Sequence, residues 1–275
     1  MSIRICVAGA TGWAGSALVK AILASPDFIF TGGIARKSAG QDIGTVLGLN
    51  PAGVRVASTL KEALAQPADV LVDYTKPDSV KARTLEALSN GLRVVIGTSG
   101  LSAEDYKEID RQAQEKNLGV IAAGNFSITA ALAKHFALFA ARHIPSWEII
   151  DYAQADKPDA PSGTVRELAE ELANVAKNQI ARPIDQTLGN KETRGGIIAG
   201  TPVHSVRLRS FVISFEAIFG LPDERLTIRH DSGSGAQPYV AGTLLAVRHV
   251  MQIKGLVRGL DRLLFAREGS GSGMP

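Results

Sequence analysis

The sequence predicts an α/β protein in two regions: a doubly wound parallel sheet, then an α+β region whose sheet is mainly antiparallel. From Ile3 to about Ala123, short apolar runs alternate with segments of helical periodicity, which is typical of βαβ units. From Val203 to His230, three runs alternate apolar and polar residues, which predicts half-buried antiparallel strands. The chain has 275 residues, which suits two modest domains.

The first region alternates strands and helices along its whole length. The predicted strands are residues 3–8, 28–35, 54–56, 69–74, 93–96 and 119–122, and the predicted helices are residues 16–24, 60–65, 79–90 and 103–116. Parallel strands joined by right-handed crossovers have their carboxyl ends at one edge of the sheet, where ligands bind. The loops at these ends are polar or glycine-rich, namely residues 9–15, 36–37, 75–77, 97–100 and 124–126.

The second region begins with a long helix at residues 129–143. Predicted strands follow at 147–152, 203–209, 212–218 and 225–230, with a helix at 165–176 and a long loop at 183–200. A last helix at 239–252 and a segment at 256–264 are expected to fold back on the first domain. We therefore predict a dinucleotide-binding domain (1–124 and 240–268), a substrate-binding and oligomerisation domain (125–239) and a disordered Gly/Ser-rich tail (269–275).

A glycine-rich turn joins the first strand to the first helix. Gly9, Gly12 and Gly15 form GxxGxxG, a variant of the dinucleotide-binding fingerprint. Gly9 would make the tight turn, Gly12 would let the backbone approach a pyrophosphate, and Gly15 would allow close helix–strand packing. A turn without a ligand is the alternative. The strand–turn–helix context favours a cofactor and a Rossmann-like domain.

The second strand ends in Arg36 and Lys37. Sites that take NAD usually have an acidic residue there, which binds the ribose hydroxyls. Two cations instead would attract a 2′-phosphate, and arginine can bind it with two hydrogen bonds. The sequence therefore predicts NADPH as the cofactor, with NADH bound more weakly.

The segment KPDAPSGT, residues 157–164, leads into the predicted helix of the second region. Ser162 suits the N-cap position, so the backbone N–H groups of Ser162, Gly163 and Thr164 are expected to face whatever lies before the helix. A helix N-terminus binds carboxylate or phosphate, and Lys157 adds a positive charge nearby. The alternative is a plain capped helix with Lys157 in solvent. The segment predicts a cradle for a small acidic molecule.

Composition narrows the class of protein. Net charge is only +3, and no basic run with interleaved aromatic residues appears, so no nucleic-acid partner is expected. No apolar run reaches the length of a membrane span, and no signal-peptide pattern or metal site is predicted. The single cysteine, Cys6, lies inside the first predicted strand and is expected to be buried. We expect a cytoplasmic protein.

Several segments resemble the dihydrodipicolinate reductases, NAD(P)H-dependent enzymes of lysine and diaminopimelate biosynthesis. In chain order they are GATGWAG, DYTKPDSV, VIGTSG, NFS, KPDAPSGT, HSVR and LTIRHDS, and they span nearly the whole chain. The resemblance implies nicotinamide near residues 97–100, a substrate carboxylate held by Ser162, Gly163 and Thr164 beside Lys157, and a homotetramer assembled through the second domain's sheet. The predicted cofactor-binding residues are Gly9, Ala10, Thr11, Gly12, Trp13, Ala14, Gly15, Arg36, Lys37, Tyr74, Thr75, Gly97, Thr98, Ser99, Asn125 and Phe126.

The chain departs from the family pattern at two places. Ala153 and Gln154 stand where the family has paired histidines, the first of which is its presumed proton donor. Residues 233–237 lack the arginine that the family has there. Gln154 can still donate a hydrogen bond to a substrate carboxylate. For proton transfer, Lys157 is favoured over Tyr152 and Asp156, because a partly desolvated lysine gives up its proton readily.

The predicted function is NADPH-dependent reduction of a small carboxylated cyclic imine or its unsaturated equivalent. The resemblance implies 4-hydroxy-tetrahydrodipicolinate as the substrate, with the proton arriving from Lys157 or from an ordered water. Two alternatives remain open: a paralogue that reduces a different imine or enamine acid, and a non-catalytic NADPH-binding sensor.

Overall fold

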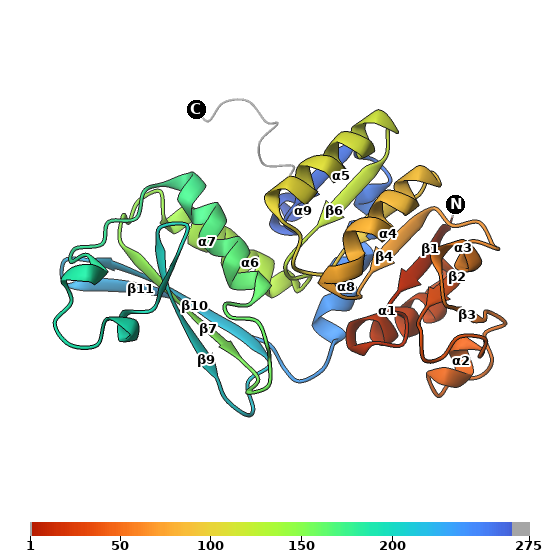
Figure 1. Cartoon of the computed structure of the whole chain (residues 1–275), viewed down its shortest axis with the longest axis horizontal. Coiled ribbons are helices and arrows are strands. Elements are labelled where there is room, and N and C mark those ends of the chain that lie inside the picture. Colours follow the sequence, from red (N-terminus) through yellow and green to blue (C-terminus); the bar gives the residue numbers. More distant parts are fainter. Residues whose placement is uncertain (1, 266–275) are drawn as a thin grey trace. The chain divides into compact units, whose positions relative to one another are not determined.

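The computed structural model describes residues 2–265 of the chain. Contacts divide these residues into two compact units (Figure 1). Unit 1 comprises the residues up to Ile128 together with those from Ala236 onward, and unit 2 is Thr129–Gly235. The sequence placed these boundaries at 124/125 and 239/240. The predicted tail, residues 269–275, lies outside the described residues, as do residues 266–268 of the predicted first domain.

Unit 1 is built on a parallel sheet of seven strands, in the order β12-β6-β5-β4-β1-β2-β3. The strands are β1 (Ile3–Ala8), β2 (Phe28–Ile34), β3 (Val56–Ala57), β4 (Val70–Asp73), β5 (Arg93–Ile96), β6 (Gly119–Ala122) and β12 (Gly255–Arg258). The chain runs outward from β1 on one side and from β4 on the other. This reversal of strand order creates the topological switch point at which doubly wound sheets bind ligands.

Helices cover both faces of this sheet. They are α1 (Trp13–Ala24), α2 (Ile43–Val46), α3 (Leu60–Ala63), α4 (Pro77–Ser89), α5 (Ala103–Glu115), α8 (Gln237–Val250) and α9 (Asp261–Leu264). Helix α1 contacts α8, whereas α4 contacts both α3 and α5. The sequence missed α2 and β12, because both are too short to show a periodicity.

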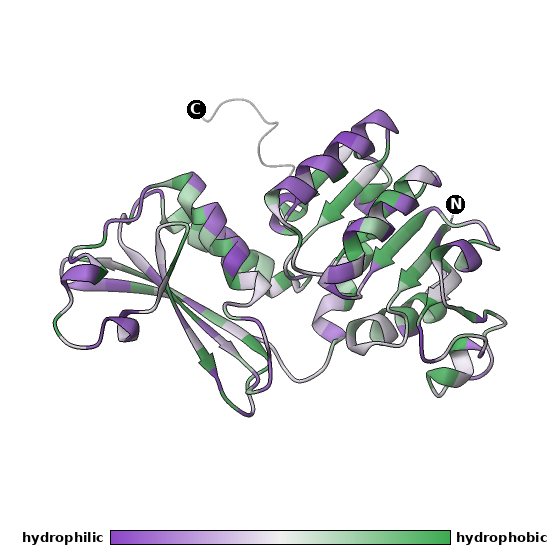
Figure 2. Ribbon diagram, viewed as in Figure 1, coloured by the Kyte–Doolittle hydropathy of each residue, from purple (hydrophilic) through white to green (hydrophobic). Residues whose placement is uncertain are grey.

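The strands of unit 1 are mostly apolar (Figure 2). β4 reads Val-Leu-Val-Asp, and all four residues are buried. Burial on both faces explains the continuous apolar runs, since helices exclude water from each side of a parallel sheet. The predicted doubly wound α/β fold is confirmed.

Unit 2 has a mixed sheet of five strands in the order β11-β10-β7-β9-β8. The elements are α6 (Ile128–Ala140), β7 (Trp147–Ala153), α7 (Gly163–Val175), two 3-10 turns (Ile184–Gln186 and Lys191–Arg194), β8 (Gly196–Ile198), β9 (Thr201–Arg207), β10 (Ile213–Leu221) and β11 (Glu224–Asp231). Only β7 and β9 pair in parallel; the other pairings are antiparallel, as predicted. The predicted loop 183–200 contains β8 and both 3-10 turns.

The two faces of the unit 2 sheet differ. Along β7, Trp147, Ile149, Asp151 and Ala153 are buried, and the residues between them are only partly buried. The buried face packs against apolar residues of α6 and α7, including Ala137 and Leu168. This alternation has the period of two that is typical of a strand with one buried face. Among residues 2–265, none of the helices combines the length and apolar character that a membrane span requires.

Candidate functional site

The glycine-rich turn of unit 1 needs its glycines for close packing. Gly9 has φ +78°, and a Cβ there would lie 2.1 Å from the Tyr74 carbonyl oxygen. A Cβ on Gly15 would lie 2.1 Å from the carbonyl oxygen of Gly9. Gly12 is the N-cap of α1 and has no side chain to cap it, so the first N–H groups of α1 remain available for an anion. The turn therefore fits a dinucleotide pyrophosphate.

Arg36 and Lys37 follow β2 and are exposed. Neither side chain makes a hydrogen bond or an ion pair with another residue of the range 2–265. Two unpaired cations after the second strand suit a phosphate, because no internal partner has to be displaced.

A buried aspartate organises the loops after β4 and β5. Asp73 is fully buried at the end of β4, and its Oδ1 accepts hydrogen bonds from Thr75 N (3.0 Å), Thr75 Oγ1 (2.6 Å) and Thr98 Oγ1 (2.9 Å). The Thr75 N–H also donates to Thr98 Oγ1 at 2.8 Å. The two predicted cofactor residues Thr75 and Thr98 are thus brought together, although 23 positions separate them in the sequence.

Tyr74 supports the same edge of the sheet from inside. A Cβ on Gly97 would lie 2.2 Å from the Tyr74 ring, so only glycine fits there. The Tyr74 hydroxyl lies 2.6 Å from Thr243 Oγ1 of α8, and burial raises the pKa of this phenol. Phe126 is also buried and packs edge-on to the Tyr74 ring, with centroids 6.3 Å apart. The side chains of Tyr74 and Phe126 therefore pack together behind the loops at the carboxyl ends of β4 and β6.

Two other predicted cofactor residues, Ser99 and Asn125, lie in the loops after β5 and β6. Ser99 is exposed at the carboxyl end of the sheet. The Asn125 Oδ1 accepts a hydrogen bond from Ser127 N at 2.8 Å, which stabilises the turn after β6.

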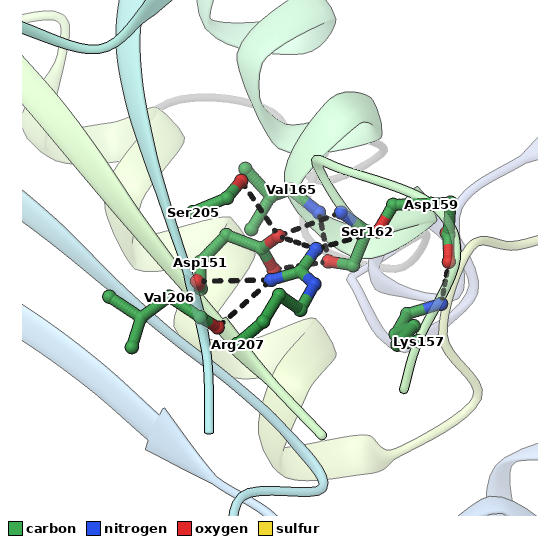
Figure 3. Close-up of polar contacts among 8 residues, drawn as sticks. All are labelled: Asp151, Lys157, Asp159, Ser162, Val165, Ser205, Val206 and Arg207. Carbon is green, nitrogen blue, oxygen red and sulfur yellow. Dashed lines mark hydrogen bonds and ion pairs between the residues drawn. The ribbon is translucent and has the colours of Figure 1, made fainter. Parts of the chain in front are cut away.

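In unit 2 the KPDAPSGT segment is fixed from beneath by Asp151 of β7 (Figure 3). The fully buried Asp151 carboxylate accepts hydrogen bonds from Ser162 N (2.9 Å), Ser162 Oγ (2.7 Å) and Ser205 Oγ (3.3 Å). Arg207 Nη2 donates to the same carboxylate at 2.8 Å and to the Asp159 carbonyl oxygen at 2.7 Å. Arg207 of β9 therefore contacts both the carboxylate that holds Ser162 and the backbone of the segment itself at Asp159.

The structure corrects the expectation that the Ser162 N–H faces a ligand. Both the N–H and the hydroxyl of Ser162 donate to Asp151, and Ser162 Oγ accepts from Val165 N at 3.4 Å as the N-cap of α7. The Gly163 N–H, in contrast, donates to no group within residues 2–265. Thr164 follows in the first turn and is buried. Among these three residues, the N–H of Gly163 is therefore the group left available for an anion.

Lys157 lies at the edge of the segment, with its side chain 24% exposed. Its Nζ forms an ion pair with the Asp159 carboxylate, as Figure 3 shows. Gln154 is exposed at the start of the same turn, and its carbonyl oxygen accepts from Lys157 N at 3.1 Å. Lys157 and Gln154 are thus placed together beside the predicted cradle.

Strand register decides which neighbouring side chains share the cradle's face of the sheet. β7 and β9 pair Asp151 with Ser205 and Ala153 with Arg207, so these four residues lie on one face. Tyr152 belongs to the opposite face, where its hydroxyl donates to Glu216 Oε1 at 3.2 Å. This register removes Tyr152 as a proton donor at the cradle.

Of the other groups near β7, His204 faces away from the cradle and Asp156 is exposed. His204 lies on the same face as Tyr152, and its Nε2 is 2.8 Å from Glu148. Asp156 is exposed in the turn after β7. Ala153 occupies the cradle's face and is fully buried.

Within residues 2–265, no cluster of side chains suits a metal ion.

Comparison with known proteins identifies the family. The family described as "Dihydrodipicolinate reductase, N-terminus" matches residues 3–126, and "Dihydrodipicolinate reductase, C-terminus" matches residues 126–264. The chain belongs to the dihydrodipicolinate reductase family. It is therefore an oxidoreductase that uses a pyridine nucleotide, and a non-catalytic sensor is set aside.

Relatives of this family match the chain over nearly its full length. The 4-hydroxy-tetrahydrodipicolinate reductase of Moorella thermoacetica is 38% identical and covers 96% of this chain and 98% of its own. That of Thermosynechococcus vestitus is 36% identical and covers 95% of this chain and 97% of its own.

One solved structure gives the same assignment, and a more distant one shares only the fold. A dipicolinate-bound dihydrodipicolinate reductase of Paenisporosarcina sp. TG-14 has a TM-score of 0.77 and 32% identity, covering 95% of this chain and 99% of that one. An amine dehydrogenase of Mycobacterium smegmatis, at TM-score 0.65 and 16% identity, shares the fold.

Sequence reasoning missed the residues that support the two sites. Asp73 and Asp151 each end or lie within an apolar strand, and each is a charged residue at a position where the pattern predicts burial. That mismatch was the available signal, because a buried charge is kept only when it is paired or fully hydrogen-bonded.

Proposed function

We propose that this enzyme reduces 4-hydroxy-tetrahydrodipicolinate with NADPH. The observation that carries the proposal is the KPDAPSGT cradle. Its helix N-terminus is fixed by the buried Asp151 and Arg207, and the Gly163 N–H is left for an anion. The relatives that share the whole chain are named for this substrate.

Unit 1 would hold the cofactor. The turn from Gly9 to Gly15, including Ala10, Thr11, Trp13 and Ala14, receives the pyrophosphate, and Arg36 and Lys37 receive the 2′-phosphate that distinguishes NADPH from NADH. The residues proposed near the nicotinamide are Tyr74, Thr75, Gly97, Thr98, Ser99, Asn125 and Phe126. When bound, the reduced nicotinamide supplies the hydride.

Unit 2 would hold the substrate. A substrate carboxylate accepts from the Gly163 N–H and from Thr164, while Ser162 keeps the helix start in place and Gln154 donates from the side. Lys157 supplies positive charge and, directly or through an ordered water, the proton. When the Lys157 ammonium moves from Asp159 to a substrate carboxylate, it exchanges one ion pair for another. The ammonium is therefore paired before and after the substrate binds.

The assembly and location are also proposals. A homotetramer formed through the unit 2 sheet is supported by the β7 residues Glu148, Ile150 and Tyr152, which are only partly buried in the single chain. Without a membrane-spanning helix in the described range, a cytoplasmic location is proposed for this biosynthetic enzyme.

Turnover of 4-hydroxy-tetrahydrodipicolinate, followed as NADPH oxidation, tests the proposal. Lys157→Ala should lower turnover by roughly 10²-fold, because general acid catalysis typically contributes about 10²–10⁴-fold. Lys157→Arg should retain the substrate KM and lose turnover, because arginine keeps its proton. The control Lys177→Ala removes an exposed lysine beyond α7 and should match wild type.

A second candidate function is reduction of a different cyclic imine or enamine acid. Ala153 and Gln154, in place of paired histidines, favour it, because neither side chain can transfer a proton. Turnover confined to another imino acid would replace the first proposal with this one. Normal turnover by Lys157→Ala on the best substrate would contradict the role given to Lys157.

A further inference from the structure

Arg83 of α4 reaches the carboxyl edge of the unit 1 sheet. Its Nη1 donates to Asp73 Oδ2 at 2.7 Å and to Thr75 Oγ1 at 2.8 Å. The Arg83 side chain is 18% exposed and the Asp73 side chain 0%. The guanidinium therefore neutralises a buried carboxylate and directly contacts a predicted cofactor residue.

The hydrogen bonds around Asp73 fix the direction of both threonine hydroxyls. An ionised carboxylate only accepts hydrogen bonds, and a hydroxyl has one proton to donate and two lone pairs. Thr75 donates that proton to Asp73 Oδ1, and Thr98 donates its proton to Asp73, where Oδ1 at 2.9 Å and the carbonyl oxygen at 3.2 Å both accept. Thr75 Oγ1 then accepts from Arg83, and Thr98 Oγ1 accepts from Thr75 N. One lone pair remains on each hydroxyl.

We infer that Arg83 is a positioning residue for the cofactor: together with Asp73 it holds Thr75 and Thr98 so that both present hydrogen-bond acceptors. Acceptors in this place suit the N–H and O–H donors of the cofactor, its carboxamide and ribose hydroxyls. The inference rests on the proposed function, which places Thr75 and Thr98 at the nicotinamide end of the site.

A second arginine–aspartate pair at the opposite end of the same strands provides a control for the loss of an arginine from the sheet edge. Arg4 of β1 donates from Nη2 to Asp69 Oδ1 at 2.6 Å, just before β4 begins. β1 and β4 run parallel, with Ile5 opposite Val70 and Ala8 opposite Asp73. Arg4 thus makes a more exposed ion pair, with side chains 42% and 24% exposed, at the amino edge, away from the predicted cofactor loops.

The first test measures the Kd for NADPH by fluorescence of the reduced cofactor. Arg83→Met should weaken binding by about tenfold, because small displacements of positioning groups are costly. Arg83→Lys should recover most of this loss, and Arg4→Met should bind like wild type. The KM for the imine substrate should stay unchanged in all three. A purely structural role of Arg83 would change both the Kd for NADPH and the KM for the substrate, or would change neither.

A double-mutant cycle between Arg83→Met and Thr75→Val decides whether Arg83 acts through Thr75. If it does, Arg83→Met costs less than about threefold in the Thr75→Val background, since coupled residues are not additive. Additive losses, or an Arg83→Met enzyme with wild-type affinity, overturn the inference. If Arg83→Met does not fold, Arg83→Gln takes its place in the cycle. A wild-type enzyme that binds no NADPH contradicts the proposed function instead.

Discussion

Unit 1 and unit 2 each contain a fully buried aspartate beneath the candidate site. The two aspartates accept hydrogen bonds from the same kinds of donor: one backbone N–H, two hydroxyls and one arginine. Asp73 accepts from the Thr75 N–H, from the hydroxyls of Thr75 and Thr98, and from Arg83. Asp151 accepts from the Ser162 N–H, from the hydroxyls of Ser162 and Ser205, and from Arg207. Burial of a charge is tolerated at both positions because every partner is a hydrogen-bond donor.

The difference between the two aspartates lies in where the donors come from. Those of Asp73 are 2, 10 and 25 positions away in the sequence. Those of Asp151 are 11, 54 and 56 positions away. Unit 1 therefore assembles its support from consecutive βα units. Unit 2 depends on β9 returning beside β7, so its support forms only when the whole unit has folded.

The largest expected effect is on stability. Asp151→Asn leaves Arg207 without its charged partner and should lower the stability of unit 2 by about 3 kcal/mol, the lower end of the cost of breaking a buried ion pair. Asp73→Asn should destabilise unit 1 by a similar amount. Denaturant titration can follow unit 2 through Trp147, which is 3% exposed, in a Trp13→Phe background.

The matched control is Asp231→Asn, which breaks the pair between Arg229 Nε and Asp231 Oδ2 in the same unit. This pair is exposed, and exposed pairs contribute little. Equal losses of unfolding free energy from Asp231→Asn and Asp151→Asn would contradict the claim that the buried Asp151 stabilises unit 2 more than an exposed aspartate does.

A smaller effect separates the roles of the two units. Arg36→Ala combined with Lys37→Ala should weaken NADPH binding by about tenfold, equivalent to roughly 1.4 kcal/mol, and leave NADH binding nearly unchanged. The substrate KM should not move, because both cations belong to unit 1. Arg111→Ala, which removes another exposed arginine of unit 1, is the control. Equal losses for NADPH and NADH would contradict the assignment of the 2′-phosphate.

An effect of the same size uses the single cysteine as a reporter of unit 1. Cys6 is fully buried in β1, and burial raises the pKa of its thiol to about 12, so alkylation requires opening of unit 1. NADPH at ten times its Kd should slow labelling by about tenfold. Dipicolinate, and the variant Asp151→Asn, should leave the labelling rate unchanged. Protection by dipicolinate but not by NADPH would reverse the proposed ligand assignment.

Much of unit 1 was predictable from local pattern. β1, β5 and β6 were predicted with their observed bounds, because buried parallel strands are short apolar runs bounded by loops. The strand-end rule also brought Thr75 and Thr98 to the same edge before any contact was known. Arg83 was not anticipated, since helix periodicity does not say which polar residue of α4 turns inward.

Unit 2 shows which features of the site cannot be predicted from the sequence alone. Residue type determined by itself the presence of strand β7, the Ser162 N-cap and the glycines of the β1–α1 turn, because these depend on neighbours a few positions away. Only the tertiary structure decided that Asp151 takes the Ser162 N–H and that Tyr152 faces away from the cradle. Both follow from the parallel register of β7 and β9, in which Asp151 meets Ser205. Register is a long-range property, set by packing of the whole unit, and a shift of one residue would exchange the two faces.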